Sequence, residues 1–147
     1  MTLDEKDLKI LEILKENSKL RTSQISKKTR MPITTVHNRI KKLEKESIIK
    51  SYTVIPNYKK LGKSILSYIL VSVIYTIPSG EKISQENVAK KIKQIGVEEV
   101  SIVTGGMDII VKIRVKDIEE LNDFVIKKLR NISGVDKTQT LIVLSSF

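Results

Sequence analysis

The sequence has no cysteine and no tryptophan, and it has a single histidine, His37, among 147 residues. The absence of cysteine excludes disulfides, thiolate chemistry and zinc sites built on cysteine. A lone histidine cannot form a metal site, and no carboxylate lies at ligand spacing from His37. We therefore expect neither a bound metal nor a cofactor held by such residues.

Long apolar runs are missing too. No apolar run reaches the roughly 18 residues that a transmembrane helix needs. The N-terminal stretch MTLDEKDLKI is acidic and polar, unlike the basic and then apolar pattern of a signal peptide. The apolar content of 40% is nevertheless enough for a packed core. We expect a cytoplasmic protein of one medium or two small domains, with no part in a membrane.

Positive charge is distributed unevenly along the chain. Residues 1–60 hold 15 basic and 7 acidic side chains, a net charge of +8, whereas residues 61–147 hold 12 and 10, a net charge of +2. A positive charge spread evenly along the chain could reflect composition alone. This asymmetry indicates a module that binds a polyanion, joined to a nearly neutral module.

The pattern over residues 22–49 is typical of a helix-turn-helix. Proline fits the first turn of a helix but rarely its interior, so Pro32 marks a break and a new start. The helix that follows, over residues 33–46, has an apolar stripe at steps of three and four, made of Ile33, Val36, Ile40 and Leu43. A shorter helix over residues 23–28 precedes the turn at the spacing of this motif.

The flanking segments complete the motif. A supporting helix is expected over residues 5–17, capped by Asp4, and Thr22 is expected to cap the short helix. A β-like segment over residues 48–56 favours a winged variant. Ser47 stands where a helix end usually has glycine, which predicts strain at that corner.

The polar face of the helix over residues 33–46 is the candidate DNA-reading surface. Short polar side chains there are expected to reach base edges, and these are Thr34, Thr35, His37 and Asn38. Basic side chains are expected to reach phosphates, and these are Arg39, Lys41 and Lys42. The alternatives are a merely solvated face, and for one basic residue an ion pair with Glu44 or Glu46.

Beyond residue 64 the pattern predicts a βαββαβ order. Strands are expected over residues 65–77, 99–104, 108–115 and 137–145, with helices over residues 85–95 and from Ile118 to a break at Gly134. This order is the ferredoxin-like arrangement, an antiparallel sheet with both helices on one face. The other face of the first strand carries a second partly apolar set of residues, so we expect another copy of the chain to cover it.

The turn at Gly105 and Gly106 is the candidate ligand site. By default it is a plain hairpin turn. Asp108 beside it could accept the ammonium group of an amino acid while backbone N–H groups hold the carboxylate, or it could simply bond to the turn backbone.

Five ordered stretches resemble the Lrp/AsnC, or feast/famine, family of transcription regulators. They are LDEKDLKILEIL (residues 3–14), TTVHNRIKKLEKESII (34–49), KLG (60–62), VTGGMDIIVKI (103–113) and ISGVDKTQT (132–140). The MPITTVHNRI version especially resembles archaeal members.

The resemblance implies an α+β protein with a DNA-binding domain (residues 1–49), a β-hinge linker (50–64) and a ferredoxin-like oligomerisation and effector domain (65–147). It implies dimers that assemble further into octamers on double-stranded DNA, with an amino-acid effector bound between subunits. The implied effector residues are Thr104, Gly105, Gly106, Met107, Asp108, Thr138 and Thr140. Arg30, Pro32, Ser47 and Met107 depart from common residues of the family.

Two other functions compete with a regulator. A small enzyme would need a nucleophile with its base, paired carboxylates or a metal cluster, and the second half has neither histidine nor cysteine. RNA binding on the sheet would need exposed strand aromatics for base stacking, and these are too few. We therefore expect a sequence-specific regulator and not an enzyme.

Overall fold

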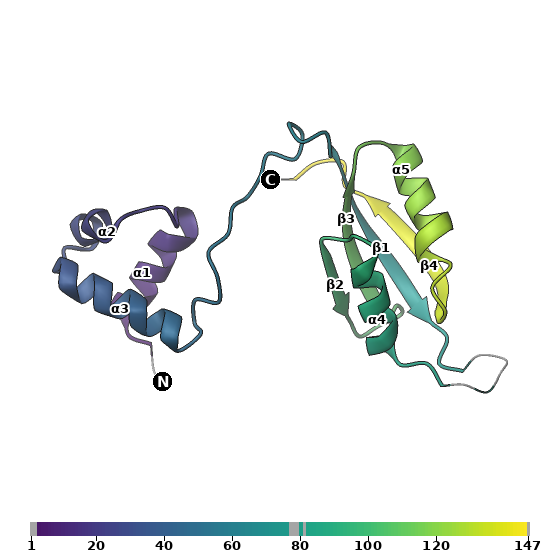
Figure 1. Ribbon diagram of the computed structural model, residues 1–147, viewed down its shortest axis with the longest axis horizontal. Coiled ribbons are helices and arrows are strands. Elements are labelled where there is room, and N and C mark those ends of the chain that lie inside the picture. Colours follow the sequence, from purple (N-terminus) through teal and green to yellow (C-terminus); the bar gives the residue numbers. More distant parts are fainter. Residues whose placement is uncertain (1–2, 77–79, 81, 147) are drawn as a thin grey trace. The chain divides into compact units, whose positions relative to one another are not determined.

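Two separate apolar cores divide the chain. The computed structural model describes residues 3–76, 80 and 82–146, and its contacts separate Met1–Ile55 from Pro56–Phe147 (Figure 1). This division falls inside the segment expected to be a linker. Within the described ranges, no helix is both long and apolar enough to cross a membrane.

The N-terminal unit is a three-helix cluster. Its helices are α1 (Glu5–Glu16), α2 (Thr22–Thr29) and α3 (Ile33–Lys45). Asp4 caps α1 as expected, because its side chain accepts a hydrogen bond from the Asp7 backbone N–H. The buried apolar core consists of Ile10, Leu14, Ile25, Met31, Val36 and Leu43.

Three expectations for this unit need correction. The cap of α2 is Arg21 and not Thr22, because the Gln24 side chain accepts from the Arg21 N–H and the helix begins one residue earlier. Ile33 lies at the first turn of α3, beyond the core, and is 52% exposed. Residues 48–56 form no strand, because a strand needs a paired neighbour and this chain supplies none there.

Two residues other than glycine, among those that the structure describes, adopt left-handed backbone conformations. Arg30 follows α2 with φ of 56°, and Ser47 follows α3 with φ of 55°. A side chain in this region costs about 1–2 kcal/mol, which glycine avoids. The strain predicted at the Ser47 corner therefore has a backbone basis.

We expect Ser47→Gly to stabilise the N-terminal unit by about 0.5–1 kcal/mol, since the relief of strain exceeds the extra entropy of unfolded glycine. Thermal unfolding followed by circular dichroism measures this. Ser51→Gly, at an exposed position with no positive φ, is the matched control and should give no gain. Equal behaviour of the two variants would contradict the assignment of strain to Ser47.

The C-terminal unit has the expected βαββαβ order. Its elements are β1 (Ile65–Val73), α4 (Gln85–Gln94), β2 (Glu99–Ile102), β3 (Ile109–Val115), α5 (Ile118–Asp123) with a π-helical continuation (Phe124–Leu129), and β4 (Val135–Ile142). All pairings are antiparallel, in the order β2-β3-β1-β4. This confirms the ferredoxin-like arrangement.

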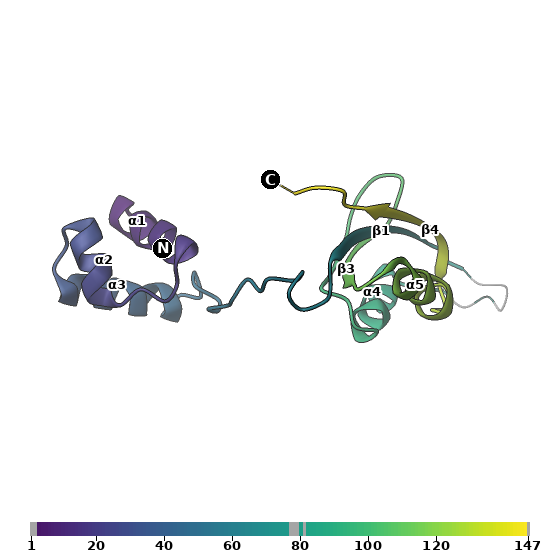
Figure 2. The ribbon, with the colours of Figure 1, turned by 90° about the horizontal axis from the view of Figure 1, so that it is seen from above.

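Both helices of this unit cover one face of the sheet (Figure 2). Alternate residues of β1 and β3 point into that layer, and those with 0% exposure are Ser67, Ile69, Val71, Ile109 and Val111. Ile118 lies at the first position of α5 and is 56% exposed. Gly134 approaches α4 closely: a Cβ there would lie 2.8 Å from Val88 Cγ2.

The strand ends differ slightly from the expected ones. β1 stops at Val73, where its pairing with β4 shifts register, and β4 runs from Val135 instead of Lys137. Ile77 and most of the expected stop at Pro78–Gly80 lie outside the described residues.

Candidate functional site

The outward face of α3 displays most of the predicted DNA-contacting side chains. Thr34, His37, Asn38, Lys41 and Lys42 are exposed, and Thr35 is half-buried. The structure also places Thr35, Asn38 and Lys42 around one shallow hollow of about 350 Å³. The first two turns of a recognition helix commonly reach base edges in the major groove.

Positive charge on this face is left largely uncompensated. Neither Lys41 nor Lys42 lies within 4.0 Å of a carboxylate in the described part of the chain. Glu44 instead accepts a hydrogen bond of 2.7 Å from the Tyr52 hydroxyl. Burial, together with this bond to Glu44, raises the pKa of Tyr52 to about 12. Both lysines are therefore available to bind phosphate.

The surroundings of Arg39 differ from those expected of a side chain that binds phosphate. Its Nη1 donates to both carboxylate oxygens of Asp4, at 2.8 and 2.7 Å, and to Oδ1 of Asp7 at 2.7 Å. Asp7 is 2% exposed. The partners are thus on α1 and its cap, and neither Glu44 nor Glu46 is involved. This ion pair joins α3 to α1.

The contacts among Arg39, Asp4 and Asp7 also shift the pKa values of Arg39 and Asp4. The Asp7 and Asp4 carboxylates raise the pKa of Arg39, and the Asp7 backbone N–H, followed by Arg39, lowers the pKa of Asp4. A lowered pKa means that ionised Asp4 stabilises the fold above its ordinary pKa of 3.8. That contribution disappears as the pH falls through the folded-state pKa.

The glycine turn between β2 and β3 borders a second hollow, of about 850 Å³. Among the predicted effector residues, Thr104, Gly105 and Asp108 line it, whereas Gly106 and Met107 do not. The remaining lining residues are Gln85, Ile102, Val103 and Ile110. The hollow therefore combines a few polar groups with an apolar wall.

Asp108 is the most strongly bonded residue of this hollow. Its Oδ1 accepts from the Tyr75 hydroxyl at 2.6 Å and from Gln85 Nε2 at 2.7 Å, and its Oδ2 accepts from Val73 N at 2.8 Å. Asp108 thus bonds to β1 and α4 instead of the turn backbone. Tyr75 first, and then the Val73 N–H, lower the pKa of Asp108. No basic side chain of the described residues forms an ion pair with it.

No pattern in the sequence marks two of the partners in this network. Tyr75 follows the end of β1 and Gln85 begins α4, and neither belongs to a motif that marks a ligand site. Hydrogen bonds among Tyr75, Gln85 and Asp108 join groups 10 to 33 residues apart in the chain. Only the folded arrangement of β1, α4 and the turn brings them together.

Thr138 and Thr140 lie elsewhere in a single chain. Thr138 of β4 is opposite Val71, whose other neighbour is Ile109 of β3. Two strand spacings, about 10 Å, therefore separate Thr138 from the β3 end of the turn. Its Oγ1 accepts from Arg130 Nε at 3.1 Å. Neither threonine lines the hollow beside Asp108.

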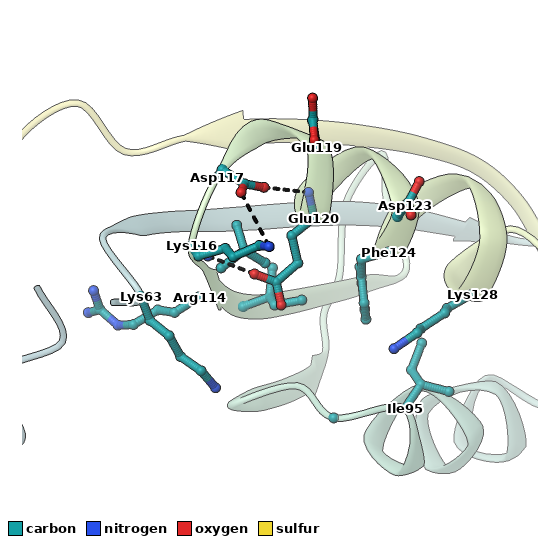
Figure 3. Close-up of a pocket in the computed structure, with 13 residues that line it drawn as sticks. Lys63, Ile95, Arg114, Lys116, Asp117, Glu119, Glu120, Asp123, Phe124 and Lys128 are labelled. Atoms are coloured by element: carbon teal, nitrogen blue, oxygen red, sulfur yellow. Dashed lines mark hydrogen bonds and ion pairs between the residues drawn. The ribbon is translucent and has the colours of Figure 1, made fainter. Parts of the chain in front are cut away.

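A further cavity, of about 420 Å³, lies beside the start of α5 (Figure 3). Its acidic and basic lining groups are mostly engaged in local structure. Asp117 caps the helix by accepting from Glu120 N, Glu120 accepts from Lys116 N, and Lys116 Nζ pairs with Asp117. This arrangement is explained by helix capping and needs no ligand.

The sheet face opposite the helices carries apolar side chains. Leu66, Tyr68 and Leu70 of β1 are only half-buried, as is Ile110 of β3, and Leu141 of β4 is 45% exposed. No described helix of this unit covers that face (Figure 2). A face of this kind is typical of a surface that binds another protein chain.

The whole chain is similar to known transcription regulators. Residues 3–50 match the family model described as winged helix-turn-helix DNA-binding, and residues 71–147 match the Lrp/AsnC ligand binding domain. An uncharacterised HTH-type transcriptional regulator of Pyrococcus furiosus is 44% identical over 95% of this chain and 91% of its own length. The HTH-type transcriptional regulator FL11 of the same organism is 41% identical over 97% and 89%.

Solved structures agree in fold. A transcriptional regulator of Neisseria meningitidis, crystallised as a complex with L-Met, superposes with a TM-score of 0.88 at 25% identity, covering 98% of this chain and 91% of that one. LrpC of B. subtilis superposes with a TM-score of 0.85 at 26% identity, covering 100% and 98%.

Proposed function

Because the chain belongs to the Lrp/AsnC family of HTH-type transcription regulators, we propose that it reads specific DNA through α3 and responds to an amino acid bound beside Asp108. Its family and relatives are regulators, which confirms that the chain is not an enzyme. We place it in the cytoplasm, where a regulator with relatives in Pyrococcus reaches DNA.

The exposed face of α3 is the observation that supports the proposed DNA binding. It offers Thr34, His37 and Asn38 as hydrogen-bonding groups, and Lys41 and Lys42 as cations without carboxylate partners in the described structure. The first set fits base edges and the second fits phosphates. Arg39, already bonded to Asp4 and Asp7, we assign to holding α3 in place.

Binding to duplex DNA should weaken by orders of magnitude between about 50 and 200 mM salt, because phosphate contacts release counterions. Asn38→Ala should change sequence preference, since it removes a base-reading amide. Lys42→Ala should weaken all sequences alike and reduce the salt slope by about one. Selection of bound DNA fragments, followed by titrations at several salt concentrations, measures both effects.

Glu12→Ala is the matched control on the DNA side, because this exposed residue lies on α1 and forms no ion pair in the described structure. It should leave preference and salt slope unchanged. Salt-insensitive binding, or equal affinity for RNA of the same length, would contradict the proposal and favour the competing RNA-binding function.

Asp108 supports the amino-acid effector. It is an ionised, half-buried carboxylate held by three neutral donors, and one lone-pair position on Oδ2 remains for an ammonium group. The apolar wall of Ile102 and Ile110 suits an apolar amino-acid side chain. The other predicted effector contacts remain predictions, because they depend on a second subunit. They are Gly106, Met107, Thr138 and Thr140.

Assembly is the third part of the proposal. Members of this family are oligomeric, and the half-buried apolar side chains on the open sheet face suit a second copy of the chain. We propose a homodimer formed by this face, with further assembly to an octamer. A dimer would also present two copies of α3 to a pseudo-palindromic DNA site.

A further inference from the structure

We propose that a second cationic surface, outside the helix-turn-helix, binds the phosphate backbone of the same DNA. This surface is the basic turn, residues 57–64, at the start of the C-terminal unit. The proposal rests on the DNA binding proposed above and adds a contact with no sequence preference of its own. Its ligand is the phosphodiester backbone beside the site that α3 reads.

The charge of the region is one-sided. Between Glu46 and Glu81 the chain has no acidic residue, and four of its side chains there are basic. Three of the four, Lys59, Lys60 and Lys63, fall in the basic turn and are exposed. None of the three lies within 4.0 Å of a carboxylate in the described part of the chain. In this unit Lys112, Lys116 and Lys127 form such pairs, whereas Lys90, Lys91 and Lys128 do not within the described residues.

The basic turn is an ordered structure. Lys60 N donates to the Asn57 side chain at 3.2 Å, Lys63 N donates to the Tyr58 carbonyl at 2.9 Å, and Gly62 has a φ of 73°. The Arg114 guanidinium of β3 lies 4.0 Å from the centre of the Tyr58 ring. These contacts fix the turn to the sheet, so its lysines lose little backbone freedom when they bind.

The turn also borders a concave surface of suitable chemistry. The lining of a hollow of about 260 Å³ there includes Lys59, Lys63, Arg114, Ser64, Ser145 and Ser146. The lysines and the hydroxyl groups around this hollow match a phosphate group, which accepts from both. The Oε1 of Glu98 lies 3.1 Å from Arg114 Nε and compensates the charge of Arg114. Among the described residues, no carboxylate forms such a pair with either lysine of the hollow.

The chain length allows this contact. Lys59 follows the end of α3 at Lys45 by 14 residues, which span at most about 50 Å when fully extended. A duplex held by α3 offers one phosphate per about 1.7 Å of its axis. Phosphates beyond the recognition site are therefore within reach of the basic turn.

The test is a triple variant, Lys59→Gln, Lys60→Gln and Lys63→Gln, compared with the wild type in binding to a mixed-sequence duplex. The slope of log affinity against log salt should fall in magnitude by about 2–3 for each bound chain, and affinity at about 150 mM salt should drop about 100-fold. The matched control is Lys90→Gln, Lys91→Gln and Lys128→Gln, three exposed lysines on α4 and the π-helical turn. It removes the same charge and should change the slope by less than about one.

Four outcomes would overturn the inference. The slope of the first triple variant could stay within about one of the wild-type value, or the control could lose as much as the first variant. Sedimentation measures the assembly state of both variants, and a smaller assembly in the first variant alone would assign its loss to oligomerisation and also overturn the inference. A wild type that ignores duplex DNA would instead defeat the proposed function. Preference of the turn for RNA or for an acidic peptide over duplex DNA would overturn only this inference.

Discussion

Arg39→Met should destabilise the N-terminal unit by about 2–4 kcal/mol, although the replaced side chain belongs to the face of α3 that we propose contacts DNA. The physical reason is Asp7, which is 2% exposed and receives a hydrogen bond of 2.7 Å from Arg39. Without the guanidinium, a buried carboxylate has no cation to compensate it. Urea unfolding followed by helical circular dichroism measures the loss.

Two further variants separate charge from packing. Lys42→Met removes an equal charge from an exposed position on the same helix and should leave stability within about 0.5 kcal/mol of the wild type. The double variant Asp7→Leu with Arg39→Met should recover most of the loss, because it replaces both charged partners by apolar groups. If the double variant were no more stable than the single one, the ion pair would not be the cause.

The same double variant decides between the two roles of Arg39. As a residue that positions α3, Arg39 can be replaced together with Asp7 without change to the salt slope of DNA binding. A drop of about one in that slope would instead restore the original expectation that Arg39 binds a phosphate.

Asp108→Asn should weaken the binding of an amino-acid effector about 100-fold, because it removes the charge that we assign to the ligand's ammonium group. The asparagine oxygen can still accept from Val73 N, so the turn should keep its structure. Titration calorimetry against each common L-amino acid, L-methionine included, identifies the effector and measures the change. Asp123→Asn is the matched control, since Asp123 forms only an exposed ion pair with Lys127.

Unchanged affinity in Asp108→Asn would place the ammonium group elsewhere, and a wild type that binds no amino acid would remove the effector from the proposal.

The pH dependence of effector binding adds a second readout. The pKa of Asp108 lies below its ordinary value of 3.8, chiefly through the bond from Tyr75. Ligand binding should therefore be insensitive to pH in mildly acidic buffer and fade only as the pH falls below about 3.8 through the folded-state pKa.

Local patterns in the sequence predicted most of the fold. Asp4 caps a helix as expected, since a cap depends on residues three positions away. The alternation along β1 and β3 predicted the buried face of the sheet because side chains on a strand point to opposite faces in turn. The predicted ends of strands were less accurate where pairing with a neighbouring strand decides them, as at the end of β1.

The candidate sites were only partly predictable, for a related reason. Exposure of Asn38 and Lys42 follows from helical periodicity, so the face of α3 was predicted well. The pairing of Arg39 with Asp4 joins residues 35 positions apart, and the pairing of Tyr75 with Asp108 joins residues 33 apart. No local pattern encodes such contacts, which change the role assigned to Arg39 and supply the partners of Asp108.

The separation of the two cores has a consequence for how the protein tolerates stress. Six buried apolar residues support the helical unit, whereas fourteen support the sheet unit, among the residues that the structure describes. Local unfolding takes place in cooperative pieces of unequal stability. The helical unit can therefore unfold and refold while the sheet unit stays folded. In the proposed dimer, warming would then weaken DNA binding before the two sheet faces separate.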